Sequence, residues 1–161
     1  MKQSILKKLD KQLEESQKEL QVDIPEALKI AREHGDLSEN AEYKAAKERQ
    51  MFLESRISLL QKRISAVTLL DMERIPKDRS GLGSTLFLND LVTGEEKQYR
   101  LVFPEDVDPE VGKISTASPI GKALMGKQEG DEIIVPLPDQ RKEYEVIRVL
   151  TVHDNLEENK E

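Results

Sequence analysis

Glycine is almost absent from the first seventy residues: Gly35 is the only one, and it separates two segments with a heptad pattern. In the second segment, the seam positions are spaced alternately by three and four residues: Tyr43, Ala46, Gln50, Leu53, Ile57, Leu60, Ile64 and Val67. A narrow apolar seam with charged residues on the other faces is typical of a coiled coil. Two such helices joined by a short turn form an antiparallel hairpin, and arms of about 30 residues would each be roughly 45 Å long.

The first segment carries a less regular version of the same pattern. Its heptad positions are Leu6, Leu13, Leu20 and Ala27, with Leu9 and Ile30 between them and polar Ser16 and Asp23 at the remaining seam positions. Pro25 interrupts this arm, and Asp23 with Glu26 can form a capping box around a new helix start. We therefore expect a break or kink at Pro25, either as a local irregularity or as a hinge.

The composition changes after Asp71. Residues 73–80 are polar and precede seven of the eight glycines, so we predict a linker there. Strand-like runs follow at 84–88, 97–103, 113–116, 131–137 and 142–152. One short helix fits residues 118–126, with Ser118 as N-cap, Pro119 at the first helical position and Gly126 as the stop.

The predicted fold class is therefore α+β. We expect a coiled-coil hairpin over residues 1–72, with its tip at 35–40. A small antiparallel sheet with one short helix follows over 81–153. The polar tail 154–161 is expected to be disordered.

Composition excludes several classes of protein. The absence of cysteine excludes a disulfide scaffold and a thiolate zinc site. No apolar run approaches the length of a membrane span, and the N-terminus lacks the apolar region of a signal peptide, so we expect a cytoplasmic protein. Residues 1–71 carry 13 Lys+Arg and 13 Asp+Glu, and the rest carry 12 and 19. This balance argues against broad binding of duplex DNA.

Two carboxylates, Asp36 and Glu39, lie where the hairpin has to turn. Their spacing fits a capping box for the second helix, with Asp36 as N-cap and Glu39 at N3. It also fits a hard cation, because Mg²⁺ is often held by only one or two protein carboxylates together with water and phosphate oxygens. Two carboxylates alone make a weak site, so such a metal would have to be shared with another molecule. His34 and His153 have no ligand-spaced partners, and we expect no metal at either.

Basic residues follow the turn at Lys44, Lys47 and Arg49. They form either a basic stripe beside the tip or the solvated face of a coiled coil, because acidic residues alternate with them. The sequence has no phosphate-binding loop and no nucleophile–base motif, so an autonomous NTPase or hydrolase is not expected.

Two stretches of the sequence resemble the signatures of one family. Residues 31–46, AREHGDLSENAEYKAA, resemble the tip signature of the Gre factors, the bacterial transcript cleavage factors. Residues 118–127, SPIGKALMGK, followed by Glu129-Gly130-Asp131, resemble their second signature. The order and spacing of the two match the family across essentially the whole chain, and the neutral arm favours the GreA branch over the GreB branch.

The resemblance implies a fold and a function. The C-terminal half would be an FKBP-like domain that docks on the secondary-channel rim of RNA polymerase through Ser118, Pro119, Ile120, Gly121 and Lys122. The coiled coil would reach down that channel, where Asp36 and Glu39 would help to hold the second catalytic Mg²⁺ and a water.

In that picture the polymerase's own active site cuts the backtracked RNA, so the chain itself is not an enzyme and holds Mg²⁺ only as a shared ion. Lys44, Lys47 and Arg49 would face the RNA, whose 3′ end is contacted only indirectly. The chain would act as a monomer.

Two alternatives remain open at this stage. One is a Gre-like protein that binds the channel and regulates or inhibits transcription without stimulating cleavage. The other is an unrelated coiled-coil chaperone with a prolyl isomerase domain. That alternative requires an aromatic peptide-binding pocket, for which the C-terminal half offers Phe87, Tyr99, Phe103 and Tyr144.

Overall fold

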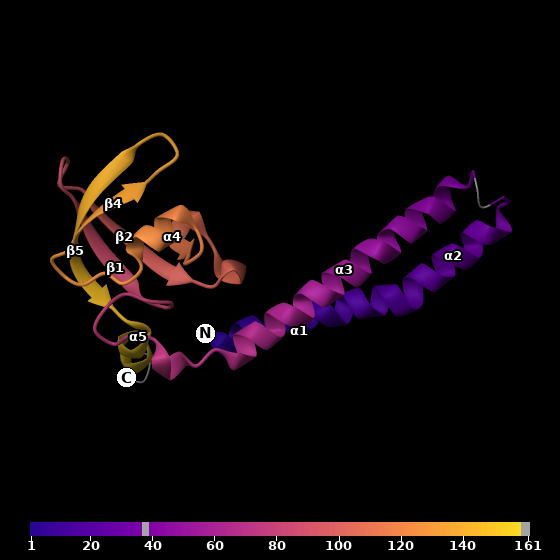
Figure 1. Cartoon of the computed structure of the whole chain (residues 1–161), viewed down its shortest axis with the longest axis horizontal. Coiled ribbons are helices and arrows are strands. Elements are labelled where there is room, and N and C mark those ends of the chain that lie inside the picture. Colours follow the sequence, from indigo (N-terminus) through magenta and orange to yellow (C-terminus); the bar gives the residue numbers. More distant parts are fainter. Residues whose placement is uncertain (37–38, 159–161) are drawn as a thin grey trace. The chain divides into compact units, whose positions relative to one another are not determined.

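The computed structural model describes residues 1–36 and 39–158. The chain divides into two compact units, Met1–Leu70 and Asp71–Glu161, and each is described here by itself. The first unit is helical, and the second is built on a sheet (Figure 1).

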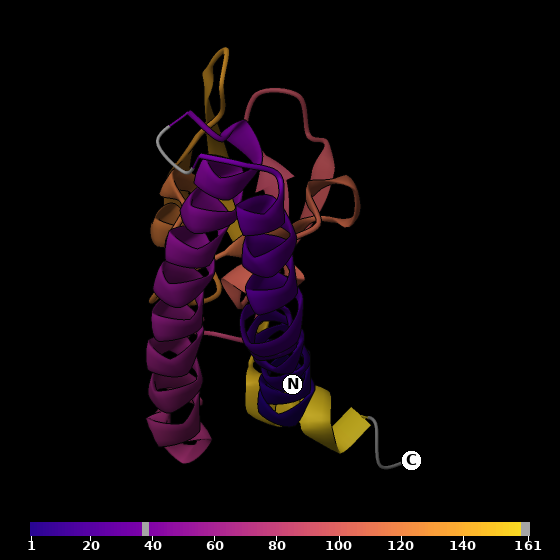
Figure 2. The same ribbon diagram turned by 90° about the vertical axis from the view of Figure 1, so that its right-hand side faces the viewer.

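The first unit is the predicted antiparallel hairpin. Its first arm consists of α1 (Lys2–Lys18), a π-helical turn (Glu19–Asp23) and α2 (Ile24–Glu33). Its second arm is α3 (Ala41–Leu69), whose 29 residues span about 43 Å. Both α1 and α2 pack along α3, as the two views in Figures 1 and 2 show. At the open end, Lys2 Nζ donates hydrogen bonds of 2.7 Å to the carbonyl oxygens of Thr68 and Leu70, in the last turn of α3 and just after it.

The seam of α3 is confirmed. Ala46, Leu53, Leu60 and Val67, spaced seven apart, are all buried. The positions between them, Gln50, Ile57 and Ile64, are half-buried. The single apolar stripe of this helix is therefore used along its whole length to hold the opposite arm.

The seam of the first arm is shifted from the prediction. Ile5, rather than Leu6, is fully buried, and Leu9 and Ser16 then follow the expected phase. Beyond the π turn the buried residues are Ile24, Leu28 and Ala31, whereas the predicted Ala27 is exposed and Ile30 is 43% exposed.

The π turn explains the part of this shift that follows it, from Ala27 to Leu28 and from Ile30 to Ala31. A π turn closes i→i+5 hydrogen bonds and so takes up one residue more than an α turn, which moves every later side chain by one position. Pro25 is the second residue after this turn and has no amide hydrogen to continue the α ladder. The predicted irregularity near Pro25 is confirmed. The predicted capping box is not formed, because Asp23 makes no side-chain capping bond.

The second unit contains a five-stranded sheet. Its strands are β1 (Thr85–Asp90), β2 (Glu96–Val102), β3 (Lys113–Ser115), β4 (Glu132–Pro136) and β5 (Arg141–Leu150). They lie in the order β3-β2-β1-β5-β4, and all neighbours are antiparallel except β2 and β3, which run parallel. Each lies close to its predicted run, and the α+β fold class is confirmed.

One face of this sheet packs against the short helix α4 (Pro119–Leu124) (Figure 1). The buried core consists of Leu86, Leu88, Leu101, Leu124, Ile133, Val135, Tyr144 and Val146. In β1 and β5 these positions alternate along the strand, as expected for a sheet with one buried face.

Two boundary predictions need correction. The segment 73–80 begins within a 3₁₀ turn (Met72–Arg74), and it buries Ile75 and Ser80, so it is part of the packed unit rather than a free linker. The tail is helical in its described part, as α5 (Val152–Glu158). Thr151 Oγ1 donates to Asp154 Oδ2 at 2.7 Å, and this capping pair starts a helix at a position where composition alone had indicated disorder.

Candidate functional sites at the hairpin tip and around helix α4

Asn40 joins the two arms at the tip. Its Oδ1 accepts a 3.0 Å hydrogen bond from the Tyr43 amide, which makes Asn40 the N-cap of α3. Its Nδ2 donates at 2.6 Å to the carbonyl oxygen of Ala31 near the end of α2. One side chain therefore satisfies a terminal backbone group of each helix.

This arrangement corrects the predicted capping box. Helix α3 begins at Ala41, so Asp36 is not its N-cap and Glu39 is not at N3. The sequence signal was present, because Asn is as good an N-cap as Asp, but the Asp-x-x-Glu spacing favoured the earlier position. Leu37 and Ser38, which complete the predicted 35–40 tip, lie outside the described residues.

Asp36 and Glu39 are both exposed and line one open hollow of about 390 Å³. His34, Asn40, Ala41 and Glu42 complete its lining. His34 Nδ1 lies 2.7 Å from Glu42 Oε2, so these two side chains pair with each other across the turn. The hollow therefore places Asp36 and Glu39 beside the cap of α3, which is made by Asn40.

The donor set at the tip suits a shared divalent cation. Within residues 1–36 and 39–158, no group of three His, Cys, Asp or Glu side chains is placed to hold a metal ion. Two exposed carboxylates fit Mg²⁺ only if its other ligands are water and oxygens of another molecule. Asp36 and Glu39 could therefore serve as two ligands of a Mg²⁺ ion whose remaining ligands come from another molecule.

The second candidate site is the start of α4. Ser118 Oγ accepts from the Gly121 amide at 3.0 Å and donates to the carbonyl oxygen of Ser115 at 2.8 Å, so Ser118 is the N-cap as predicted. Pro119 lies in the first turn of α4. A Cβ atom at Gly121 would lie 1.9 Å from the carbonyl oxygen of Ser115, so only glycine permits this close approach of helix and turn.

The surface of this site comes from three neighbouring residues. Pro119 and Lys122 are exposed, and Ile120 is half-buried against the core. Ser118 and Gly121 shape the turn from inside. Of the five predicted docking residues, three thus supply the surface of the segment and two hold its backbone shape.

Comparisons with known proteins match the sequence over both units. Residues 1–69 match the family model described as "Transcription elongation factor, N-terminal", and residues 75–151 match "Transcription elongation factor, GreA/GreB, C-term". GreA of Nitratidesulfovibrio vulgaris strain DP4 is 43% identical over 143 residues, which are 89% of this chain and 87% of that protein. GreA of Desulfotalea psychrophila is 40% identical over 145 residues, 90% of each chain.

The chain belongs to the GreA/GreB family of transcription elongation factors. Among solved structures, GreA factor homolog 1 (Gfh1) of Thermus thermophilus is 30% identical and covers 90% of this chain and 94% of that one, with a TM-score of 0.43. The two family models and the relatives at about 40% identity confirm the resemblance first seen in residues 31–46 and 118–131.

The basic residues of this GreA/GreB-family chain do not act as one set. Arg49 makes a two-pronged ion pair with Glu19, at 2.6 and 2.9 Å, and this hydrogen bond lowers the pKa of the Glu19 carboxyl. Lys47 Nζ donates to Gln50 Oε1 at 3.2 Å and lies 6.0 Å from the Tyr43 ring. Arg49 is about 140° around the helix from Lys44, so it braces the hairpin at the π turn instead of extending a stripe with the two lysines.

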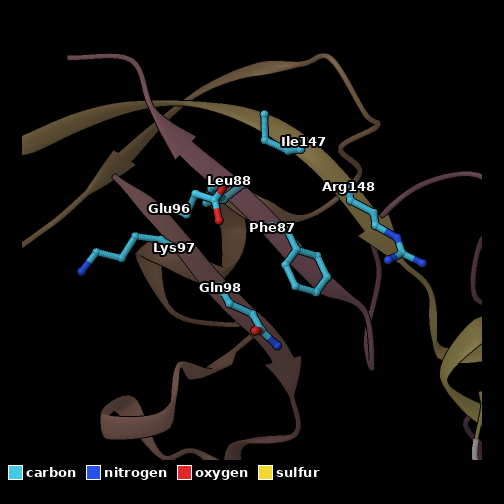
Figure 3. Close-up of a pocket in the computed structure, with 7 residues that line it drawn as sticks. All are labelled: Phe87, Leu88, Glu96, Lys97, Gln98, Ile147 and Arg148. Carbon is cyan, nitrogen blue, oxygen red and sulfur yellow. The ribbon is translucent and has the colours of Figure 1, made fainter. Parts of the chain in front are cut away.

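The four aromatic residues do not converge on a pocket. Tyr144 and Phe103 are buried, Tyr99 is partly buried against the core, and Phe87 lies on the other face of the sheet. There it lines an open groove of about 460 Å³ whose other lining residues include Gln98, Ile147 and Arg148 (Figure 3). This arrangement gives no support to a prolyl isomerase site.

None of the helices that the structure describes is both long enough and apolar enough to span a bilayer.

Proposed function

We propose that this chain binds bacterial RNA polymerase and stimulates the polymerase's own cleavage of backtracked nascent RNA. The observation that carries the proposal is the state of Asp36 and Glu39. Both are exposed, both line the same hollow at the turn of the hairpin, and α3 is capped by Asn40 instead. Membership of the GreA/GreB family supports the same function.

The hairpin acts as a stiff arm in this proposal. The seam residues Leu53 and Leu60 are buried along its length, and the Glu19–Arg49 pair braces the turn where α1 and α2 meet. A rigid arm loses little conformational entropy when its end is placed in a distant site, so its carboxylates can be positioned closely. We propose that this arm enters the secondary channel of the polymerase.

Asp36 and Glu39 would hold a Mg²⁺ ion together with groups of the polymerase active site. When bound, such an ion supplies an activated water or stabilises the leaving oxygen of a phosphodiester. The contribution of this chain is the two carboxylates, which also accept hydrogen bonds from water and so orient it. Hydrolysis is assigned to the polymerase, and the chain is an accessory factor.

Docking is assigned to the segment at α4. Pro119, Ile120 and Lys122 supply its surface, while Ser118 and Gly121 hold its shape. Lys44 and Lys47 near the tip are the cations that we propose to face the RNA. Arg49 is assigned to bracing the hairpin because its guanidinium is held by Glu19.

The proposal is tested with a stalled, backtracked complex of purified bacterial polymerase carrying end-labelled RNA. Addition of the full chain is expected to shorten the RNA much faster than the polymerase alone does. An Ile120→Asp variant is expected to lose this stimulation through loss of binding. Binding of the wild type without any faster cleavage would instead establish a channel-binding regulator, which is the alternative that shares the same fold.

A further inference from the structure

Ser80 makes four hydrogen bonds and lies in the segment 73–80, for which the sequence predicts a linker. It is 1% exposed. Its Oγ donates to the carbonyl oxygen of Leu124 at 2.6 Å and accepts from the Lys127 amide at 2.7 Å. Its backbone amide donates to the carbonyl oxygen of Lys127 at 2.8 Å, and its carbonyl oxygen accepts from the Gly126 amide at 2.9 Å.

All four of these bonds go to residues 124–127, which end α4 and follow it. The last carbonyl groups of a helix have no intrahelical donors, and the Ser80 hydroxyl supplies one for Leu124. Because α4 has only six residues, it is too short to be stable by its own hydrogen bonds. Its position therefore depends on its packing against the core, through Leu124 and Ile120, and on attachments at its two ends.

The N-terminal attachment is the Ser118–Ser115 contact already described, and the C-terminal attachment is Ser80. Between them lie the surface residues Pro119, Ile120 and Lys122. Loosening either end would let this surface segment move relative to the sheet beneath it.

We infer that Ser80 is a positioning residue for partner binding: its four bonds fix the C-terminal end of α4 and thereby the orientation of the Ser118–Lys122 segment. The inference rests on the proposed function, since it assigns that segment to polymerase docking. Ser80 does not touch the partner in this account and acts only through α4.

Ser84 provides a matched control. It is also a fully buried serine, four residues further along, and its Oγ accepts from the Gly81 amide at 2.9 Å. None of the hydrogen bonds found for its side chain goes to residues 124–127. Replacing Ser84 therefore removes a comparable buried hydroxyl without releasing α4.

The test compares Ser80→Ala with Ser84→Ala in the full chain. Hydrogen exchange is expected to rise at the amides of Gly126 and Lys127 in Ser80→Ala and to stay near wild type there in Ser84→Ala. In the cleavage assay, the concentration that gives half-maximal stimulation is expected to rise about tenfold for Ser80→Ala, the factor expected from the loss of a buried hydrogen bond. The maximal rate at saturation is expected to stay unchanged, because Asp36 and Glu39 are intact.

If Ser80→Ala does not fold, Ser80→Cys is used, because it keeps a side chain of similar shape with a weaker donor and acceptor. An equal shift of half-maximal concentration in the Ser80 and Ser84 variants would overturn the inference and leave the proposed function standing. A wild type that neither binds nor stimulates polymerase would overturn both. A lower maximal rate with unchanged half-maximal concentration would also contradict the inference, because a positioning role in docking cannot produce it.

Discussion

The side chain of Asn40 and the carbonyl oxygen of Ala31 are joined by a 2.6 Å hydrogen bond that ties the end of the first arm to the start of the second. The same side chain caps α3 through the Tyr43 amide. The turn that carries Asp36 and Glu39 is thus closed at its base by Asn40, an uncharged residue that also lines the hollow. The residues proposed for the chemistry of the tip, Asp36 and Glu39, thus differ from Asn40, which holds the turn together.

Replacement of Asn40 tests this division. Asn40→Ala removes the cap and the link to Ala31, and we expect it to lower the free energy of unfolding of the hairpin by about 1–2 kcal/mol. Asn40→Asp keeps an acceptor for the Tyr43 amide but loses the donor, so its effect should be smaller. Urea unfolding combined with hydrogen exchange at Tyr43 measures both. Equal stability of Asn40→Ala and wild type would show that the turn is held in some other way.

Gly121→Ala is expected to disrupt the docking segment. The new methyl group would overlap the carbonyl oxygen of Ser115, and overpacking of this kind typically costs about 1–3 kcal/mol. The variant should lose thermal stability and polymerase binding together. Lys122→Ala is the control for stability alone: it removes an exposed cation of the docking surface, leaves the turn intact and should not lower thermal stability. If Gly121→Ala bound as tightly as wild type, the close approach of helix and turn would have no role in docking.

Tyr144→Phe is expected to keep or raise stability. The Tyr144 side chain is fully buried, and its hydroxyl has no hydrogen-bond partner in the part of the chain that the structure describes. An unsatisfied buried hydroxyl costs about 1–3 kcal/mol, so its removal should be favourable where the ring packing is retained. The melting temperature of the variant, compared with that of Tyr99→Phe, measures the effect. A clear loss of stability would mean that the hydroxyl is satisfied in solution.

Asp90 is expected to make folding sensitive to acid. Its carboxylate accepts from the amides of Thr93 and Val92 and pairs with Lys142 Nζ at 3.1 Å, and these contacts lower its pKa from 3.8 to about 2. A lowered pKa in the folded state gives stability that is fully present above the ordinary pKa and is lost as the pH falls from about 4 to about 2.

Asp90→Asn removes this contribution. The variant should therefore be less stable than wild type at pH 6, and the difference should shrink at pH 2.5 in urea titrations. Asp139→Asn, at an exposed turn, serves as the control for loss of one carboxylate. A difference between Asp90→Asn and wild type that does not change with pH would contradict the assignment.

Local patterns in the sequence predicted much of this fold. The seam of α3 followed directly from its 3–4 spacing, and the N-cap at Ser118 followed from Ser-Pro before an apolar run. The alternation of Tyr144 and Val146 likewise indicated the buried face of β5.

The errors arose where a non-local or irregular feature decides the outcome. A π turn moved the buried position from Ala27 to Leu28, which no heptad count can reveal. Asn40 displaced Asp36 as the N-cap of α3, and its link to Ala31 depends on the second arm. Ser80 is buried because of residues 44 positions or more further along the chain, so its polar neighbourhood in sequence was misleading.

The central claim is that Asp36 and Glu39 act together as ligands donated to the active site of the polymerase. Its most direct test is RNA cleavage in a backtracked complex by the isosteric double variant Asp36→Asn with Glu39→Gln, beside wild type and a Glu42→Gln control from the same hollow. We predict that the double variant binds polymerase as wild type does but stimulates cleavage roughly tenfold to a hundredfold less. The Glu42→Gln control should stimulate cleavage about as well as wild type. Full stimulation by the double variant would contradict the claim.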